Sequence, residues 1–306
     1  MKRISIIISL FLFLSNFTVF AQEINKEPLK KQKNVVIAKQ EIVIEKTLQK
    51  RYLDALNKFK KDDFSIMVLN YSNIDIKDEL KKEESILNTD KQSYLMGLIA
   101  LNKEKKYDNQ IIKLVNEIKN SQMENGKFSD YTNKDGDDLL NSHIFGIISL
   151  YCANFDDYNK DKAFTYLLSM QNDDGGFPIF KGDNSNLDMT YMSVIALNIL
   201  GKDKNSPCVK KAYNYANKVK DIRPSVESIS WEIISKRALD MQVSKDLIKS
   251  IEEYKLQDNT YKHLKNLKKS NHMATWHGIF AELSIKKNYS LFYNLRDSSK
   301  HLFIKN

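Results

Sequence analysis

The residues best suited to chemistry stand at the beginnings of the most apolar segments of this 306-residue chain. The catalytic candidates are Glu232, His277 and Asp188, because Glu232 could form an acid–base pair with either of the other two. The ligand-binding candidates are His143, Tyr191, Trp231 and Trp276. Aromatic faces of this kind could stack on a sugar or on an apolar chain. A tryptophan at a helix start and a lone histidine are also common packing residues, so a purely structural role stays open.

A second cluster is the acidic stretch Asp135-Gly136-Asp137-Asp138. Its carboxylates could bind calcium in a flexible loop, together with Asp130 and Asn133. The spacing is not that of an EF-hand, because Tyr131 stands at the first ligand position and no Glu closes the loop. A solvated turn is the alternative, and the sequence predicts no metal site.

Several familiar signatures are missing from the sequence. It has no phosphate-binding loop, no dinucleotide fingerprint, no Gly-x-Ser-x-Gly, no His-Glu-x-x-His and no Cys-x-x-Cys. No cofactor is therefore predicted. The positive charge is spread along the chain and accompanies no recognisable module, so the sequence predicts no nucleic-acid partner.

The apolar segments that carry the candidates recur at a nearly constant spacing. Their copies cover residues 93–102, 143–152, 190–200, 231–239 and 275–283, with small anchor residues at Ala100, Ser149, Ala196, Ala238 and Ala281. The segments are apolar nearly all round, which is typical of buried helices. The helical segments between them carry Lys and Asn on one side. This alternation predicts an all-α (α/α) toroid, with two concentric rings of about six helix pairs.

A turn motif links these helices. The best copy ends an outer helix at Gln171, turns at Asp173-Asp174-Gly175-Gly176 and finishes on Phe177. Gly permits positive φ at such a turn, and Asp favours it through side-chain hydrogen bonds to the backbone. Gln171 is expected to pair with backbone groups at a neighbouring helix end. An earlier copy keeps Gln122, Gly126 and Phe128, and an echo remains at 257–261.

The segment Lys162-Ala163-x-x-Tyr166-Leu167-x-x-x-Gln171-x-x-x-Gly175-x-Phe177 resembles the repeat of squalene cyclases and protein prenyltransferase β subunits. The resemblance extends over roughly residues 90–285 and implies an (α/α) toroid. It does not imply one function, because this barrel hosts several unrelated activities.

The chemistry of either family is incomplete in this chain. Class II cyclases build their acid from Asp-x-Asp-Asp followed by Thr-Ala at the head of an inner helix, whereas here Leu139-Leu140 follow Asp138. Asn141 and His143 take the places that Asp188 and Thr190 hold in the stronger repeat. The prenyltransferase zinc site needs an Asp two residues before a Cys, and Leu150 and Ser206 stand there instead.

The first 21 residues predict a secretory signal peptide. Lys2 and Arg3 precede the apolar run 4–14, and Val19-Phe20-Ala21 offers small residues at the cleavage position. We therefore expect a secreted, periplasmic or envelope protein, cut near Ala21, with no later transmembrane segment. The formal net charge is +9, of which Lys2 and Arg3 contribute two. An anionic envelope component is a second candidate partner.

The predicted organisation is a signal peptide over 1–21, a lead-in segment over 22–45 and a toroid over 46–306. In an exported protein Cys152 and Cys208 could form a disulfide, which the sequence leaves open. The predicted function is a ligand-binding or interaction module that uses the barrel mouth. The alternative is an envelope-facing enzyme that acts on a polysaccharide or an isoprenoid-like substrate, so catalysis itself stays open.

Overall fold

The computed structural model describes residues 42–77, 80, 85–132, 136, 138–220 and 224–303. The chain divides into two compact units, Met1–Lys50 and Arg51–Asn306. In the first unit residues 42–50 are helical, and the Thr47 hydroxyl donates to the Val43 carbonyl at 2.8 Å. The predicted signal peptide and residues 22–41 of the lead-in lie outside the described residues.

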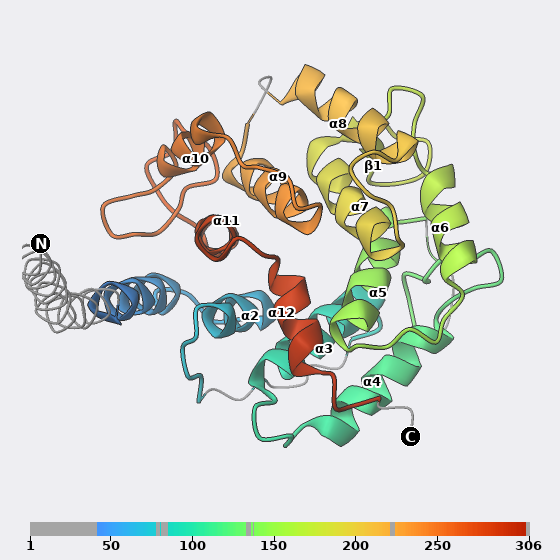
Figure 1. Ribbon diagram of the computed structural model, residues 1–306, viewed down its shortest axis with the longest axis horizontal. Helices are drawn as coiled ribbons and strands as arrows, with labels where there is room; N and C mark the ends of the chain where they lie inside the picture. Colours follow the sequence, from blue (N-terminus) through green and yellow to red (C-terminus); the bar gives the residue numbers. More distant parts are fainter. Residues whose placement is uncertain are drawn as a thin grey trace, which may run out of the picture. The chain divides into compact units, whose positions relative to one another are not determined.

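In the second unit, six inner helices follow one another around a closed ring (Figure 1). They are α2 (Asp63–Tyr71), α3 (Asn88–Leu101), α5 (Leu140–Cys152), α7 (Leu187–Ile199), α9 (Val226–Ala238) and α11 (His272–Lys287). Their apolar side chains form the core. All five anchor residues lie on inner helices, as the spacing predicted.

A second set of helices packs outside this ring. It comprises α4 (Asp108–Asn120), α6 (Lys160–Ser169), α8 (Pro207–Val219) and α10 (Lys245–Glu252). The helical residues 51–56 join the same layer, where Arg51 Nη2 lies 2.5 Å from Glu282 Oε2 of α11. These helices are amphipathic, with Lys and Asn turned to solvent. The predicted all-α toroid with an inner and an outer ring is therefore confirmed.

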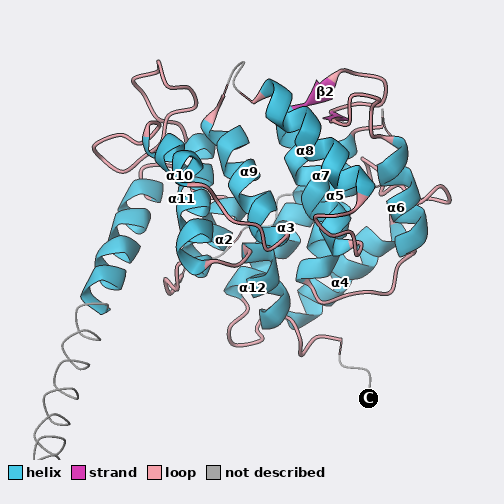
Figure 2. Ribbon diagram, turned by 45° about the horizontal axis from the view of Figure 1, so that its top comes forward, coloured by secondary structure: helices cyan, strands magenta, loops and turns pink. Residues whose placement is uncertain are grey.

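The inner helices all begin at one end of the ring. At that end the Ser93 hydroxyl of α3 donates to Asp63 of α2, and Gln92 of α3 donates to the Ser142 carbonyl of α5. The last helix, α12 (Leu291–Ser298), lies across the opposite end, against α2, α3 and α5 (Figure 2). Its Tyr293 hydroxyl donates to the Ala238 carbonyl at the end of α9. The ring is thus closed by α12 where the inner helices end, and we call the end where they begin the mouth.

The turn motif connects α4 to α5, α6 to α7 and α10 to α11. Gln171 Nε2 donates to the Gly175 carbonyl at 2.8 Å and to the Cys208 carbonyl in the first turn of α8 at 2.9 Å. In the earlier copy Gln122 donates to the Asn159 carbonyl at 2.9 Å and accepts from the Asn159 amide. The expected pairing of the glutamine with a neighbouring helix end is confirmed.

The turn itself is repeated three times with the same backbone. Gly126, Gly175 and Asn259 all have positive φ, at 92°, 93° and 63°. Asp174 Oδ1 accepts from the Gly176 amide at 2.8 Å, which confirms the expected role of the turn acids. The echo at 257–261 is therefore a third copy, in which Asn replaces Gly. After the middle copy, β1 (Phe177–Pro178) pairs antiparallel with β2 (Ser185–Asn186), so that Phe177 faces Asn186.

Candidate functional site

The inner helices align when their positions are counted from the N-cap residue. In α5, α7, α9 and α11 the N-caps are Leu139, Asn186, Ser225 and Asn271. The second helical position is then occupied by Asn141, Asp188, Glu227 and Met273, and the sixth by Phe145, Met192, Trp231 and His277. Positions four apart lie on one face of a helix, so these residues form two layers at the mouth.

The inner of these layers contains three aromatic rings and Met192. The rings of Trp276 and His277 stack with centroids 3.5 Å apart, and Phe64 of α2 stacks on Trp276 at 4.5 Å. The Trp231 ring meets His277 edge-on at 5.5 Å and also contacts Phe280. Phe280 in turn packs on Phe292 of α12. A series of aromatic ring contacts therefore runs from the mouth to the closing helix.

His277 is a neutral hydrogen-bond acceptor within this stack. The residue is only 4% exposed, and burial lowers its pKa to about 3. Nδ1 lies 2.9 Å from the Met273 carbonyl, which only accepts, so the proton is on Nδ1. Nε2 is buried and has no hydrogen-bond partner among the described residues.

The outer layer contains carboxylates. Asp188 accepts a short hydrogen bond from the Ser228 hydroxyl of α9. Burial raises the pKa of Asp188, and the nearby Glu227 carboxylate adds to this effect. Glu227 Oε2 lies 2.7 Å from His263 Nδ1. Sequence reasoning missed Glu227, although Pro224-Ser225 is a recognisable helix start that places it at the second position.

Glu232 occupies a different side of α9. It raises the pKa of Tyr191, second to burial, and its carboxylate lies 3.5 Å from Lys236 Nζ. Tyr191 packs against Tyr213 of the outer helix α8. Glu232 and Tyr191 therefore face the outer ring, and the structure does not bring Glu232 to His277. Asp188 is at the mouth, one layer above the His277 position.

His143 lies in the wall of the ring. Its Nδ1 accepts from the Phe128 amide at 3.2 Å, and Nε2 donates to the Ala163 carbonyl at 3.0 Å. The hydroxyls of Thr190 and Thr275 accept from the amides of Phe177 and Tyr261 in the same way. His143 thus holds the end of a turn motif, as Thr190 and Thr275 do. Trp231, Trp276 and His277 instead face the lumen.

The acidic loop is organised around a lysine. Lys127 is fully buried, and its Nζ lies 3.3 Å from Asp130 and 3.0 Å from Asp138. This ammonium neutralises carboxylates that were candidates for calcium. Asn133, Asp135 and Asp137 lie outside the described residues. No metal-binding cluster of His, Cys, Asp and Glu occurs in the described part of the chain.

Both cysteines are buried and free, so the disulfide that the sequence left open is not formed. The Cys152 Sγ lies 3.8 Å from the Phe292 carbonyl of α12. None of the helices in the described ranges is long and apolar enough to cross a membrane.

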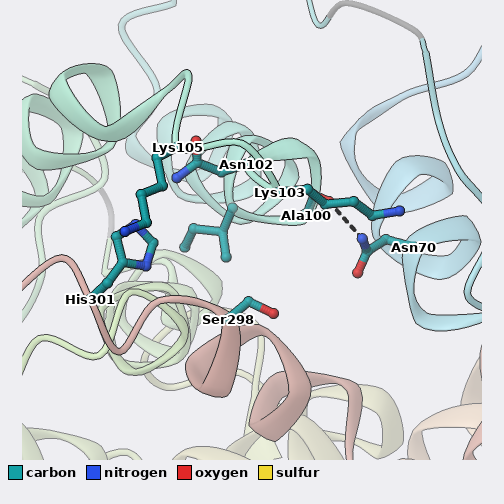
Figure 3. Close-up of a pocket in the computed structure, with 8 residues that line it drawn as sticks. Asn70, Ala100, Asn102, Lys103, Lys105, Ser298 and His301 are labelled. Atoms are coloured by element: carbon teal, nitrogen blue, oxygen red, sulfur yellow. Dashed lines mark hydrogen bonds between the residues drawn. The ribbon is translucent and has the colours of Figure 1, made fainter.

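A separate cavity of about 270 Å³ lies at the closed end (Figure 3). It is lined by Asn70, Ile99, Ala100, Asn102, Lys103, Lys105, Ser298 and His301. Two of its side-chain nitrogens have carboxylate partners: Lys103 Nζ lies 3.2 Å from Asp75, and His301 Nε2 lies 3.0 Å from Asp108. None of the sequence candidates lines this cavity. The mouth, where the aromatic and acidic layers meet, is therefore the better candidate site.

Known proteins share this architecture. The model of the prenyltransferase alpha-alpha toroid domain matches residues 38–224. A dammaradiene synthase of Dryopteris crassirhizoma is 32% identical over 81 residues, which are 26% of this chain and 12% of that protein. The protein geranylgeranyltransferase-I of Candida albicans, in complex with GGPP, superposes with a TM-score of 0.53 at 13% identity.

That superposition covers 82% of this chain and 90% of the other, and at such low identity it shows the fold alone. The family match extends over more than half of the chain and includes the turn motif, the inner helices α2 to α7 and Asp188. The chain belongs to the prenyltransferase alpha-alpha toroid domain family.

Proposed function

We propose that this protein is an exported ligand-binding module that holds an apolar, isoprenoid-like ligand at the mouth of its toroid. The observation that carries the proposal is the stack of Phe64, Trp276, His277 and Trp231 directly below the mouth. Large aromatic faces bind apolar chains through burial and dispersion. The geranylgeranyltransferase of similar fold is complexed with GGPP, which supports this ligand class.

Exposed apolar side chains beside the mouth also support the proposal. Met273 at the start of α11 is 52% exposed, and Ile86 and Leu87 stand just before α3. Ile179 and Phe180 are exposed where the chain passes the start of α5, since the Leu140 amide donates to the Ile179 carbonyl. An apolar ligand that enters here would lose little contact with apolar surface on its way to the stack.

Tryptophan fluorescence tests the proposal directly, because both tryptophans of the chain lie in the stack. Titration with farnesol, a C15 isoprenoid alcohol, is expected to shift or quench the emission with a saturable dependence on concentration. In Trp231→Phe, the emission of Trp276 alone should still saturate, at a higher farnesol concentration because part of the aromatic face is lost. Saturation by octanol at equal concentration would show general partitioning instead of a site. An unchanged emission with every isoprenoid would refute the proposal.

Asp188 favours a second candidate function, an enzyme that donates a proton at the mouth. A carboxyl group whose pKa is raised by burial is suited to general acid catalysis. The same titration separates the two functions. If the isoprenoid is recovered unchanged after long incubation, binding stands alone; if it is converted, the mouth is catalytic.

The proposal of export rests on the first 21 residues, which have the charge and apolar run of a signal peptide. We expect the mature protein, expressed from its full-length gene in a bacterium with an envelope, to begin near Gln22. N-terminal sequencing of the protein from the culture medium or periplasm measures this. Recovery of the intact Met1 terminus from the cytosol would contradict it.

A further inference from the structure

Two buried acceptor atoms at the mouth lack hydrogen-bond partners. One is His277 Nε2, whose ring has its proton on Nδ1. The other is Glu227 Oε1, while Oε2 of the same carboxylate pairs with His263. Both residues are 4% exposed. A buried acceptor that is left unsatisfied is destabilising, so native proteins rarely keep one without a reason.

The two acceptors belong to the same stretch of the lumen. Glu227 precedes Trp231 by four residues and so stands one turn nearer the mouth on the same helix face. The Trp231 ring contacts the ring of His277. Both residues therefore lie towards the mouth end of the ring, on the neighbouring helices α9 and α11.

The charge at these positions has one sign. The second and sixth positions of α5, α7, α9 and α11 contain two carboxyl groups and neither Lys nor Arg. An anionic head group here would face Asp188 and Glu227 in a poorly solvated place, where repulsion between like charges is strong. A head group that donates a hydrogen bond would instead satisfy the two open acceptors.

We propose that the mouth recognises an apolar alcohol, whose hydroxyl donates to His277 Nε2 or Glu227 Oε1 while its chain lies on the aromatic rings, and that it rejects the corresponding diphosphate. This inference rests on the proposed function. It assigns the polar end of the ligand to His277 and Glu227, and no sequence pattern pointed to these two residues together. A neutral hydroxyl is preferred to an ammonium group, because the burial that keeps His277 uncharged also disfavours a cation beside it.

The test compares four probes with one C15 chain: farnesol, farnesyl methyl ether, farnesylamine and farnesyl diphosphate. Tryptophan emission gives each dissociation constant. One hydrogen bond to a buried acceptor is expected to make farnesol bind about tenfold more tightly than its methyl ether. The diphosphate is expected to bind more weakly than either, and the amine more weakly than farnesol.

Two variants assign the effect to its acceptors. His277→Asn keeps an amide donor for the Met273 carbonyl and lacks an atom at Nε2, and Glu227→Met removes the carboxylate. Removal of the acceptor that the hydroxyl uses should reduce the ratio between the ether and alcohol dissociation constants toward one, and a ratio unchanged in both variants overturns the inference. Glu232→Met is the matched control on the same helix, and its ratio should stay near tenfold. Because a ratio is measured within each variant, a change in overall stability does not imitate the result.

The outcomes are distinct. Equal binding of farnesol and its ether by the unmodified protein, or tightest binding of the diphosphate, overturns the inference and leaves the proposed function standing. Tightest binding of the amine shows a cation site and also overturns it. If no probe binds, the proposed function fails, and the inference fails with it.

Discussion

Gly175→Ala is expected to lower the free energy of unfolding by roughly 3–5 kcal/mol, which is large for a single substitution. Gly175 has φ +93°, where an L side chain is strained. A Cβ there would also stand 2.5 Å from the Lys211 carbonyl oxygen of α8. The turn motif packs against the next outer helix at this point, so the backbone must move to admit one methyl group.

Gly201→Ala is the matched control. Gly201 has φ +86°, and a Cβ added there meets nothing within 4 Å. The free energy of unfolding of this variant should fall by only about 1–2 kcal/mol, which is the cost of a side chain at positive φ. Chemical denaturation of both variants measures the difference. Equal midpoints for Gly175→Ala and Gly201→Ala would mean that the close approach to α8 contributes nothing.

The fold could be predicted from the sequence because its elements repeat. Anchors such as Ala196 and Ala238 recur at the length of one helix pair, and each must return to the inner ring. The turn motif could be predicted as well, since Gly175 and Gln171 are required by local backbone geometry. Both features can be recognised in the sequence because each recurs along the chain with the same residue types.

The mouth could be predicted only in part, because its register depends on where α9 begins. The repeat before α9 has Lys220 in place of Gln and lacks the Gly-x-aromatic turn, so no anchor fixed the alignment. Counted from Ser225, Thr190 corresponds to Ile229 and not to Glu232. A shift of three residues turns a side chain by about 60° on a helix, which is enough to move Glu232 toward the outer ring and to hide Glu227.

The structural role of His143 could not be predicted from the sequence either. Its sequence position marks it as a helix-start imidazole, and only the three-dimensional structure shows the Phe128 amide and the Ala163 carbonyl on its two nitrogens. His277 stands two positions further along its own helix, counted from the N-cap, and so meets Trp231 in the lumen. Two histidines with similar sequence contexts thus have different surroundings, although burial affects both in the same way.

Acid is expected to destabilise the protein steeply because of these two histidines. Burial lowers the pKa of His143 and of His277 to about 3, and the positive charge of nearby Lys127 contributes at His143. In the unfolded chain a histidine has a pKa of about 6.5. Between these values the unfolded state binds more protons, so stability falls as the pH falls. Each histidine should cost about 2 kcal/mol at pH 5 relative to neutral pH, or about 4 kcal/mol together.

The contribution of one histidine can be isolated by comparing slopes. His277→Asn should reduce the dependence of unfolding free energy on pH by about 1.4 kcal/mol per pH unit between pH 6 and 4, which is one proton. The difference between the two proteins is the quantity to measure, because Asp188, whose pKa is raised, acts with the opposite sign. Carboxyl groups with lowered pKa, such as Asp258 and Glu282, contribute stability that is lost only at lower pH. Parallel slopes would mean that His277 takes up a proton in the folded state, and the neutral acceptor at the mouth would then not exist.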